Sequence, residues 1–239
     1  MLFRSFFEVA RLKQKLEENP QNHGLLIELG ALLLRRNQNL EAEKYLELAA
    51  RRGVNSAEFQ SLKGNLAIQN GKFGIAEKAF QKAISLSKSG NPAYFAALSH
   101  LYFYTTEYDR GLRWAALGLK LHGDYAPLKT IASYHLIQLK RFEEAELTLM
   151  AARRLRPLEP TIPYNLACLY GHFRDKDAII YNLRKAARNG YDKVHILELE
   201  PLFIPYRENG QFVLVAEEIK NNHLKQRNRR TLKYLRRTR

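Results

Sequence analysis

The residues of this chain best suited to chemistry are a cysteine and a histidine four positions apart. Cys168 and His172 lie in the stretch NLACLYGH, and Cys168 is the one cysteine among 239 residues. In a helix this spacing places both side chains on one face, as a nucleophilic dyad or half of a metal site would require. A cysteine nucleophile also needs an activating environment and a third group that orients the histidine, and no such third residue is evident. A hydrolase or transferase that uses this pair is therefore the least favoured interpretation.

No other motif indicates catalysis. The chain lacks GxGxxG, GxxxxGK[ST] and HExxH, and no convincing strand precedes a glycine-rich loop. Carboxylates are scattered over outer helix faces, as in EAEKYLE, where such pairs stabilise a helix by only ~0.2–0.5 kcal/mol. The seven histidines are dispersed through the chain, and their spacing does not indicate a metal site. We predict that the protein is not an enzyme and carries no cofactor and no metal.

Composition and charge indicate an ordinary globular protein with a cationic end. Hydrophobic residues make up 46% and charged residues 26%, and the formal net charge is +15. Residues 220–239 contain nine Lys and Arg and no Asp or Glu, so the preceding residues hold 39 − 9 = 30 basic residues against 24 acidic ones, a net +6. The basic character is therefore concentrated in the tail.

The sequence gives no sign of export or of membrane insertion. A single cysteine forms no internal disulfide, and no window approaches the ~18 apolar residues of a membrane span. Arg4 and Glu8 interrupt the apolar start that a signal peptide needs. We expect a cytoplasmic protein, with mitochondrial targeting by the Phe-rich start as the alternative. Because no Gly/Ser-rich or Pro-rich linker divides the chain, we also expect one continuous domain.

Small residues recur at a nearly constant interval. One series has spacings of 34, 35, 34 and 34 and consists of Gly30, Gly64, Ser99, Ser133 and Ala167. A second series keeps the same interval at Ala49, Ala83, Gly118, Ala152 and Ala186. A third consists of Ala42, Ala76, Gly111 and Ala145, with Ile179 in the fifth place. Small side chains let two helices approach closely, so the interval predicts helix hairpins that stack on their neighbours because none can bury its apolar face alone.

These repeats resemble those of the tetratricopeptide-repeat (TPR) family, whose consensus has small residues at positions 8, 20 and 27 of a 34-residue helix-turn-helix. The stretches that carry the resemblance are LLIELGALLLRRNQNLEAEKYLELA (25–49), SLKGNLAIQNGKFGIAEKAFQKA (61–83), ALSHLYFYTTEYDRGLRWAALG (97–118), IASYHLIQLKRFEEAELTLMAARRLRP (131–157) and YNLACLYGHFRDKDAIIYNLRKA (164–186). The resemblance implies an all-α, right-handed α-solenoid of five TPR-like hairpins with helical caps at both ends. Phe73, Tyr108 and Phe142 enter the second helices at a common register, where we expect them to fill the corner of each hairpin.

The same register divides the chain into segments. We expect an N-terminal capping helix in residues 1–22 and five repeats in 23–192, at about 23–56, 57–91, 92–125, 126–159 and 160–192. A degenerate C-terminal cap follows in 193–219 and the basic tail in 220–239. Pro201 and Pro205 interrupt the cap, since proline in a helix interior costs about 3 kcal/mol or more, so we predict short broken helices there and a longer helix from Asn209 or Gly210.

The resemblance also implies an inner groove that binds peptides. Positions 2, 5, 9, 12 and 13 of each repeat face inward in the family, which makes the candidate groove residues Arg35, Asn65, Gln69, His100, Tyr104, Tyr134, Gln138, Tyr164, Cys168 and His172. Glu58, Ser61, Phe103, Thr130 and Thr161 belong to the same wider lining. Family members that clamp a chaperone's C-terminal carboxylate use Lys, Asn and Arg at set positions, but here Ile27, Ala31 and Ala93 are among the residues that replace them. That type of chaperone adaptor is therefore not expected.

The functional prediction is a protein-protein interaction scaffold or adaptor whose groove binds a peptide segment of a partner. The alternative is an adaptor that contacts nucleic acid, an anionic membrane surface or an acidic protein through its tail. The basic tail residues are Lys220, Lys225, Arg227, Arg229, Arg230, Lys233, Arg236, Arg237 and Arg239.

Overall fold

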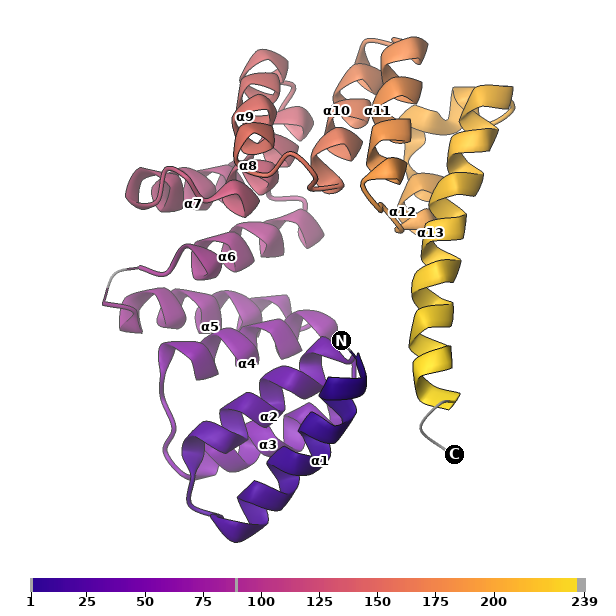
Figure 1. Cartoon of the computed structure of the whole chain (residues 1–239). Helices are drawn as coiled ribbons and strands as arrows, with labels where there is room; N and C mark the ends of the chain where they lie inside the picture. The colour runs from indigo at the N-terminus through magenta and orange to yellow at the C-terminus, as the bar shows by residue number, and fades with distance from the viewer. Residues whose placement is uncertain (1, 89, 236–239) are drawn as a thin grey trace. The chain divides into compact units, whose positions relative to one another are not determined.

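The chain is all-helical over the residues that its computed structural model describes, which are 2–88 and 90–235 for the backbone and 7–88 and 90–226 for the side chains (Figure 1). No strand occurs in these ranges, so the all-α prediction is confirmed. None of the described helices is long and apolar enough to cross a membrane.

The chain divides into two compact units, Met1–Leu121 and His122–Arg239, where the sequence had led us to expect one continuous domain. In a repeat array each hairpin packs only on its neighbours, so no single core joins all of them. A division between two hairpins is compatible with that architecture.

The first unit consists of a single helix followed by helix pairs. Its helices are α1 (Leu2–Glu18), α2 (His23–Arg35), α3 (Asn39–Arg51), α4 (Ala57–Gln69), α5 (Phe73–Leu86), α6 (Pro92–Tyr104) and α7 (Tyr108–Leu121). The pairs α2–α3, α4–α5 and α6–α7 pack as hairpins, and α2, α4 and α6 lie in a row. Helix α1 packs on α2 through Val9 and Leu12, and Lys13 forms an ion pair with Glu41 of α3.

The second unit repeats this arrangement and ends in a different kind of cap. Its helices are α8 (Ala126–Gln138), α9 (Phe142–Leu155), α10 (Thr161–His172), α11 (Lys176–Arg188), α12 (Val194–Leu199), the 3-10 helix η1 (Pro201–Tyr206) and α13 (Gly210–Leu235). The pairs α8–α9 and α10–α11 form hairpins, and α13 packs on α11 and α12. The break at Pro201 and the start of the last helix at Gly210 agree with the prediction from the prolines.

Small residues hold the two helices of each hairpin close together. A Cβ added to Gly30 would lie 2.9 Å from Leu46 Cδ2, and one added to Gly64 would lie 2.7 Å from Phe80 Cε1. The same two positions of the last hairpin hold Ala167 and Leu183, and both are fully buried. The first small-residue series therefore marks where the two helices of a hairpin approach each other most closely.

A left-handed residue closes the turn inside every hairpin. Asn37, Gly71, Thr106, Lys140 and Arg174 have φ between 55° and 69° and follow the interval of the small residues. The amide of the next residue then donates a hydrogen bond to the carbonyl five residues before it, as Lys72 N does to Ala67 O at 2.7 Å and Arg141 N does to Leu136 O at 2.9 Å. Only the second turn uses glycine, so the other side chains are held in a conformation that costs L-residues about 1–2 kcal/mol.

Tyrosine-glutamate hydrogen bonds join successive hairpins in both units. Tyr102 Oη donates to Glu77 Oε1 at 2.9 Å, and Tyr170 Oη donates to Glu146 at 2.6 Å. Arg110 also pairs with Glu77 at 2.6 Å and lies over the Tyr102 ring. Burial and the Glu77 bond raise the pKa of Tyr102 to about 12, and the Glu146 bond followed by burial does the same for Tyr170. Both phenols therefore remain hydrogen-bond donors at neutral pH.

Candidate functional site

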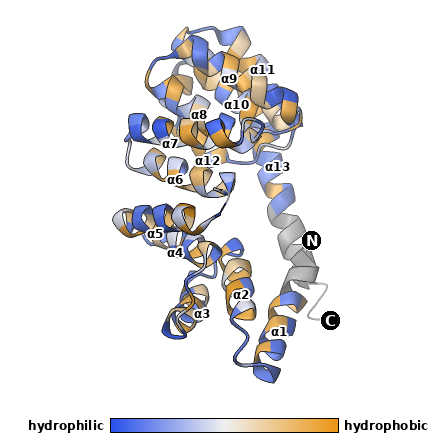
Figure 2. Cartoon of the chain, turned by 90° about the vertical axis from the view of Figure 1, so that its left-hand side faces the viewer, coloured by the Kyte–Doolittle hydropathy of each residue, from blue (hydrophilic) through white to orange (hydrophobic). Residues whose placement is uncertain are grey.

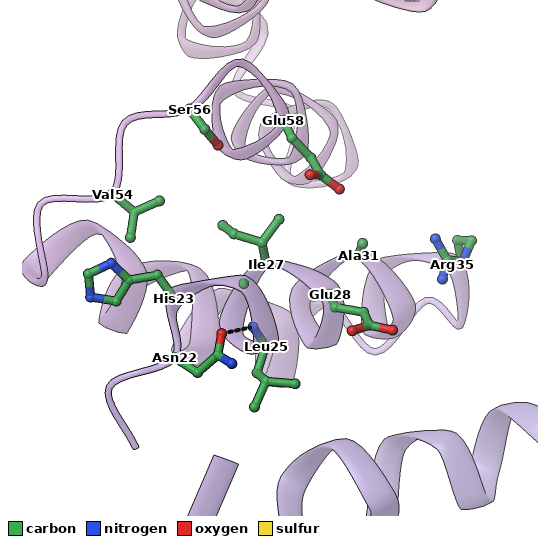
Figure 3. A pocket seen from close by; sticks show the side chains of 11 residues that line it. Asn22, His23, Leu25, Ile27, Glu28, Ala31, Arg35, Val54, Ser56 and Glu58 are labelled. Carbon is green, nitrogen blue, oxygen red and sulfur yellow. Dashed lines mark hydrogen bonds between the residues drawn. The ribbon is translucent and has the colours of Figure 1, made fainter. Parts of the chain in front are cut away.

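The first unit contains a pocket of about 680 Å³ between α2 and the start of α4 (Figure 3). Its lining comes from α2, from the loop that leads to α4 and from the first turn of α4, and consists of Asn22, His23, Gly24, Leu25, Ile27, Glu28, Ala31, Arg35, Val54, Ser56 and Glu58. Five of these residues, Gly24, Ile27, Ala31, Arg35 and Glu58, occupy repeat positions that the sequence places on the inner face.

The apolar character of α2 positions the polar groups of this pocket. Its sequence HGLLIELGALLLR buries Leu26, Leu29 and Leu33 completely, and the helix is mostly hydrophobic along its length (Figure 2). Between Gly24 and Leu34 the one charged residue is Glu28, which is exposed. A helix held so firmly on one side presents Glu28 and Arg35 from a fixed backbone.

Two N-caps fix the end of the pocket near the connecting loop. Asn22 Oδ1 accepts a hydrogen bond from Leu25 N at 3.2 Å, and Ser56 Oγ accepts one from Phe59 N at 3.1 Å. Both bonds satisfy amides that the first turn of a helix leaves without partners. The pocket is therefore bounded there by ordered turns, with the Val54 side chain between them (Figure 3).

The charged residues of the pocket come from both of its helices. Figure 3 shows the Glu58 carboxylate on α4 directed toward α2, the Glu28 carboxylate on the side of α2 below Ala31 in this view, and the Arg35 guanidinium farther along α2. Among the described side chains, none of these three residues forms an ion pair.

The other candidate groove residues of the first unit lie on α4 and α6. Gln69, His100 and Tyr104 are exposed and Asn65 is half-buried. His100, Phe103 and Tyr104 form an aromatic cluster, with the His100 and Tyr104 centroids 5.1 Å apart. Phe73 stacks on Tyr104 of the following hairpin at 6.0 Å, so the aromatic residue at the hairpin corner also packs against a predicted groove residue.

The second unit repeats this contact. Phe142 lies 5.0 Å from the His172 ring and 5.1 Å from Phe173, centroid to centroid. Partial burial, together with the Lys140 charge, lowers the pKa of His172. Tyr134 and Gln138 are half-buried. His172 is exposed but partly engaged in packing, which sequence reasoning did not anticipate.

Two candidate groove residues are not accessible, and this corrects the sequence-based interpretation. Tyr164 is 5% exposed and Cys168 is 2% exposed. Tyr164 stacks on Tyr191 with ring centroids 4.5 Å apart, and Phe203 of η1 packs against its edge. These two inward positions of α10 are thus buried beside the C-terminal cap, and neither side chain can contact a peptide in solution.

The surroundings of Cys168 are opposite to those of an activated thiol. Its Sγ lies 4.0 Å from Glu200 Oε2. Burial, and then the negative charge of Glu200, raise the pKa of the Cys168 thiol well above its usual value. Nucleophilic cysteines need the reverse shift, so the pair of Cys168 and His172 gives no support to covalent catalysis. Among the described side chains, no three His, Cys, Asp or Glu residues are grouped as metal ligands.

The basic tail is described only in part. Helix α13 runs without interruption from Gly210 to Leu235 and so crosses the predicted start of the tail. Lys220 contacts Glu217 at 3.5 Å and Lys225 is exposed. The side chains of the other predicted tail residues lie outside the described ranges: Arg227, Arg229, Arg230, Lys233, Arg236, Arg237 and Arg239.

Comparisons with known proteins agree on one kind of fold. The family model for the tetratricopeptide repeat matches residues 9–66. YrrB, described as a TPR protein with an unusual peptide-binding site, is 18% identical and superposes with a TM-score of 0.54 over 78% of this chain and 96% of its own. A TPR protein from Parabacteroides merdae is 14% identical, with a TM-score of 0.66 over 90% of this chain and 89% of its own.

A third structure, pilF from Pseudomonas aeruginosa, is 14% identical, with a TM-score of 0.65 over 87% of this chain and 97% of its own. Identities this low show a common fold. The sequence matches no protein of curated function.

Proposed function

We propose that this chain, which has the tetratricopeptide-repeat fold and matches the family model over residues 9–66, is a protein-interaction adaptor that binds a peptide segment of a partner on the inner face of its first unit. The TPR fold itself supports a protein-interaction scaffold. The binding of a peptide in the pocket between α2 and α4 is the more specific proposal.

The observation that carries this proposal is the position of the pocket. It lies at repeat positions that face inward, and it combines an apolar wall of Ile27, Ala31 and Val54 with charged residues that form no ion pair among the described side chains. Binding sites are typically concave and apolar with a few polar groups that fix orientation. The exposed side chains of Gln69, His100 and Tyr104 extend the surface along α4 and α6, where aromatic groups supply contact area.

The alternative, contact with nucleic acid or an anionic surface through the tail, stays a prediction. Its support is the charge of residues 220–239, nine basic and none acidic, on a segment that is helical to Leu235. Such binding weakens steeply as salt is raised, which separates it from binding in an apolar pocket.

A fragment library displayed on phage, selected against the full chain, tests the proposal. Ala31→Arg places a long side chain in the pocket while keeping a good helix former, and we expect it to abolish capture of the selected peptides. Ala50→Arg makes the same substitution at an exposed position of α3 outside the lining and should capture them normally. If Ala31→Arg captures peptides as well as Ala50→Arg does, the pocket is not the binding site.

A tail truncation completes the design. It should remove residues 227–239 only, because Asn222 donates hydrogen bonds to the carbonyls of Ala187 and Tyr191 and so helps to hold α13. Capture that survives this truncation belongs to the repeats, and capture that is lost belongs to the tail.

A further inference from the structure

The charge pattern of the pocket is more specific than a general peptide surface requires. The chain has 39 basic residues against 24 acidic ones, so an acidic residue at its surface has many cations available. Other glutamates of this unit do form pairs, as Glu41 does with Lys13 and Glu77 with Arg110. Glu28 and Glu58 form no ion pair among the described side chains, although both line the same pocket (Figure 3).

The lining is ordered along α2. Val54 and Ile27 lie toward the start of the helix, the Glu58 carboxylate lies over its middle with Glu28 on the helix below, and Arg35 lies at its end (Figure 3). Glu28 and Arg35 are seven positions apart, which corresponds to about 10 Å along a helix at ~1.5 Å per residue. An extended peptide covers that distance in about three residues at ~3.3 Å each.

We propose that this pocket selects an extended partner segment in which a Lys or Arg lies between Glu28 and Glu58, flanked by an aliphatic residue on one side and by a carboxylate about three residues away on the other. The proposal rests on the proposed function and names the class of peptide. The aliphatic residue contacts Ile27 and Val54, the cation meets the two carboxylates, and the peptide's acid pairs with Arg35.

This arrangement explains why both signs of charge lie in one pocket. A segment with its basic and acidic residues in the opposite order can satisfy the same groups only by reversing its direction, which changes its backbone hydrogen bonds. A purely acidic segment would meet the carboxylates of Glu28 and Glu58, and like charges placed together disfavour the wrong partner. At the two glutamates the pocket therefore prefers a basic residue, whereas a site that clamps a terminal carboxylate with basic residues prefers an acidic group.

The expected effect of removing the carboxylates is moderate, because Glu28 and Glu58 are exposed. Ion pairs at exposed sites contribute little each, and two of them correspond to roughly a 2- to 30-fold change in dissociation constant. Screening should reduce the effect as the salt concentration rises, since the Debye length falls to ~3 Å at 1 M.

The test is a selection of random displayed peptides against the full chain, followed by titration of the strongest binder as a synthetic peptide. We expect the selected sequences to be enriched in an aliphatic-basic pair with an acid about three residues from the basic residue. Glu28→Gln/Glu58→Gln should bind the synthetic peptide roughly 2- to 30-fold more weakly at low salt. Glu43→Gln/Glu47→Gln, which changes the same charge on α3 outside the lining, should bind it like the wild type.

A second arm exchanges the peptide's cation. Replacing its Lys or Arg by Gln should weaken binding to the wild type and leave binding to Glu28→Gln/Glu58→Gln almost unchanged. Selected peptides that bind equally well with the cation removed, or that are enriched in acidic residues at that position, overturn the proposal.

The failures of the two proposals are distinguishable. If Ala31→Arg abolishes binding but the glutamine variant binds normally, peptide binding in the pocket stands and the basic preference is wrong. If Ala31→Arg binds normally, both are wrong. Self-association of the wild-type chain that Glu28→Gln/Glu58→Gln removes would make a second copy the occupant and would also overturn the proposal.

Discussion

Replacing Gly64 by alanine should destabilise the second hairpin, although the same change stabilises most helices. A Cβ at Gly64 would lie 2.7, 2.8 and 2.9 Å from Phe80 Cε1, Cζ and Cδ1. The Phe80 ring is fully buried, so it cannot move aside into solvent. Overpacking costs typically 1–3 kcal/mol and the helical gain of alanine over glycine offsets about 1, so we expect a net loss of up to about 2 kcal/mol.

Gly74→Ala is the matched control. Gly74 lies in the first turn of α5 with nothing within 4 Å of its added Cβ, so this variant should be stabilised by up to about 1 kcal/mol. Urea denaturation followed by circular dichroism measures both variants. Hydrogen exchange of the α4 and α5 amides then shows whether the loss is confined to this hairpin, as expected where each repeat contacts only its neighbours.

A second substitution isolates the clash itself. Gly64→Ala/Phe80→Leu introduces the residue types that the last hairpin has at the same repeat positions, Ala167 and Leu183, which are both fully buried, so the double variant should be more stable than the sum of the single changes predicts. A coupling of about 1 kcal/mol or more is expected for residues in direct contact. If Gly64→Ala is as stable as Gly74→Ala, a small residue at position 64 is not needed for α4 and α5 to approach each other closely.

Three further predictions concern the buried thiol, the turns and the cap. In the folded chain, the Cys168 thiol should react with a disulfide reagent ~100-fold or more slowly than in the chain unfolded by urea, because the reagent reaches it only when the cap opens locally. Equal reaction rates in the two states would contradict the burial of Cys168. Lys140→Gly should raise the free energy of unfolding by up to about 1 kcal/mol and Gly71→Ala should lower it by about as much, since both positions have positive φ; urea titrations that give the reverse order would refute this. Burial raises the pKa of Glu200, so the folded state holds its proton more tightly than the unfolded state, and the stability from this group is complete below the unfolded pKa and is lost as pH rises through the folded one. Glu200→Gln keeps an acceptor for Leu202 N–H, so its Tm relative to the wild type should rise between acidic and neutral pH, and a difference independent of pH would count against the assignment.

The hairpins could be predicted from the sequence because their signal is repeated. The interval from Gly30 to Ala167 sets where helices must approach, and proline at 201 and 205 sets where they break. These features act locally and need no knowledge of distant contacts. The division into two units at Leu121 was not predicted, because a repeat array carries no composition signal at such a junction.

The site could be predicted only where the repeat register continues. Arg35 and Glu58 lie in the pocket, as their inward positions indicate, whereas Glu28 falls at a position that the register does not mark as inward. Its isolation within an apolar helix was the signal that could have identified it. Tyr164 was misjudged because Tyr191 and Phe203, which cover it, come from a segment that departs from the repeat.

The most direct test of the account is to map a selected peptide on the full chain by amide chemical shifts in NMR. We expect the largest shift changes in residues 23–35 and 54–58, which hold the pocket lining apart from Asn22, with small changes in α3 and α13. Changes centred on α13, or on helices of the second unit, would contradict the claim that the inner face of the first unit is the peptide-binding site.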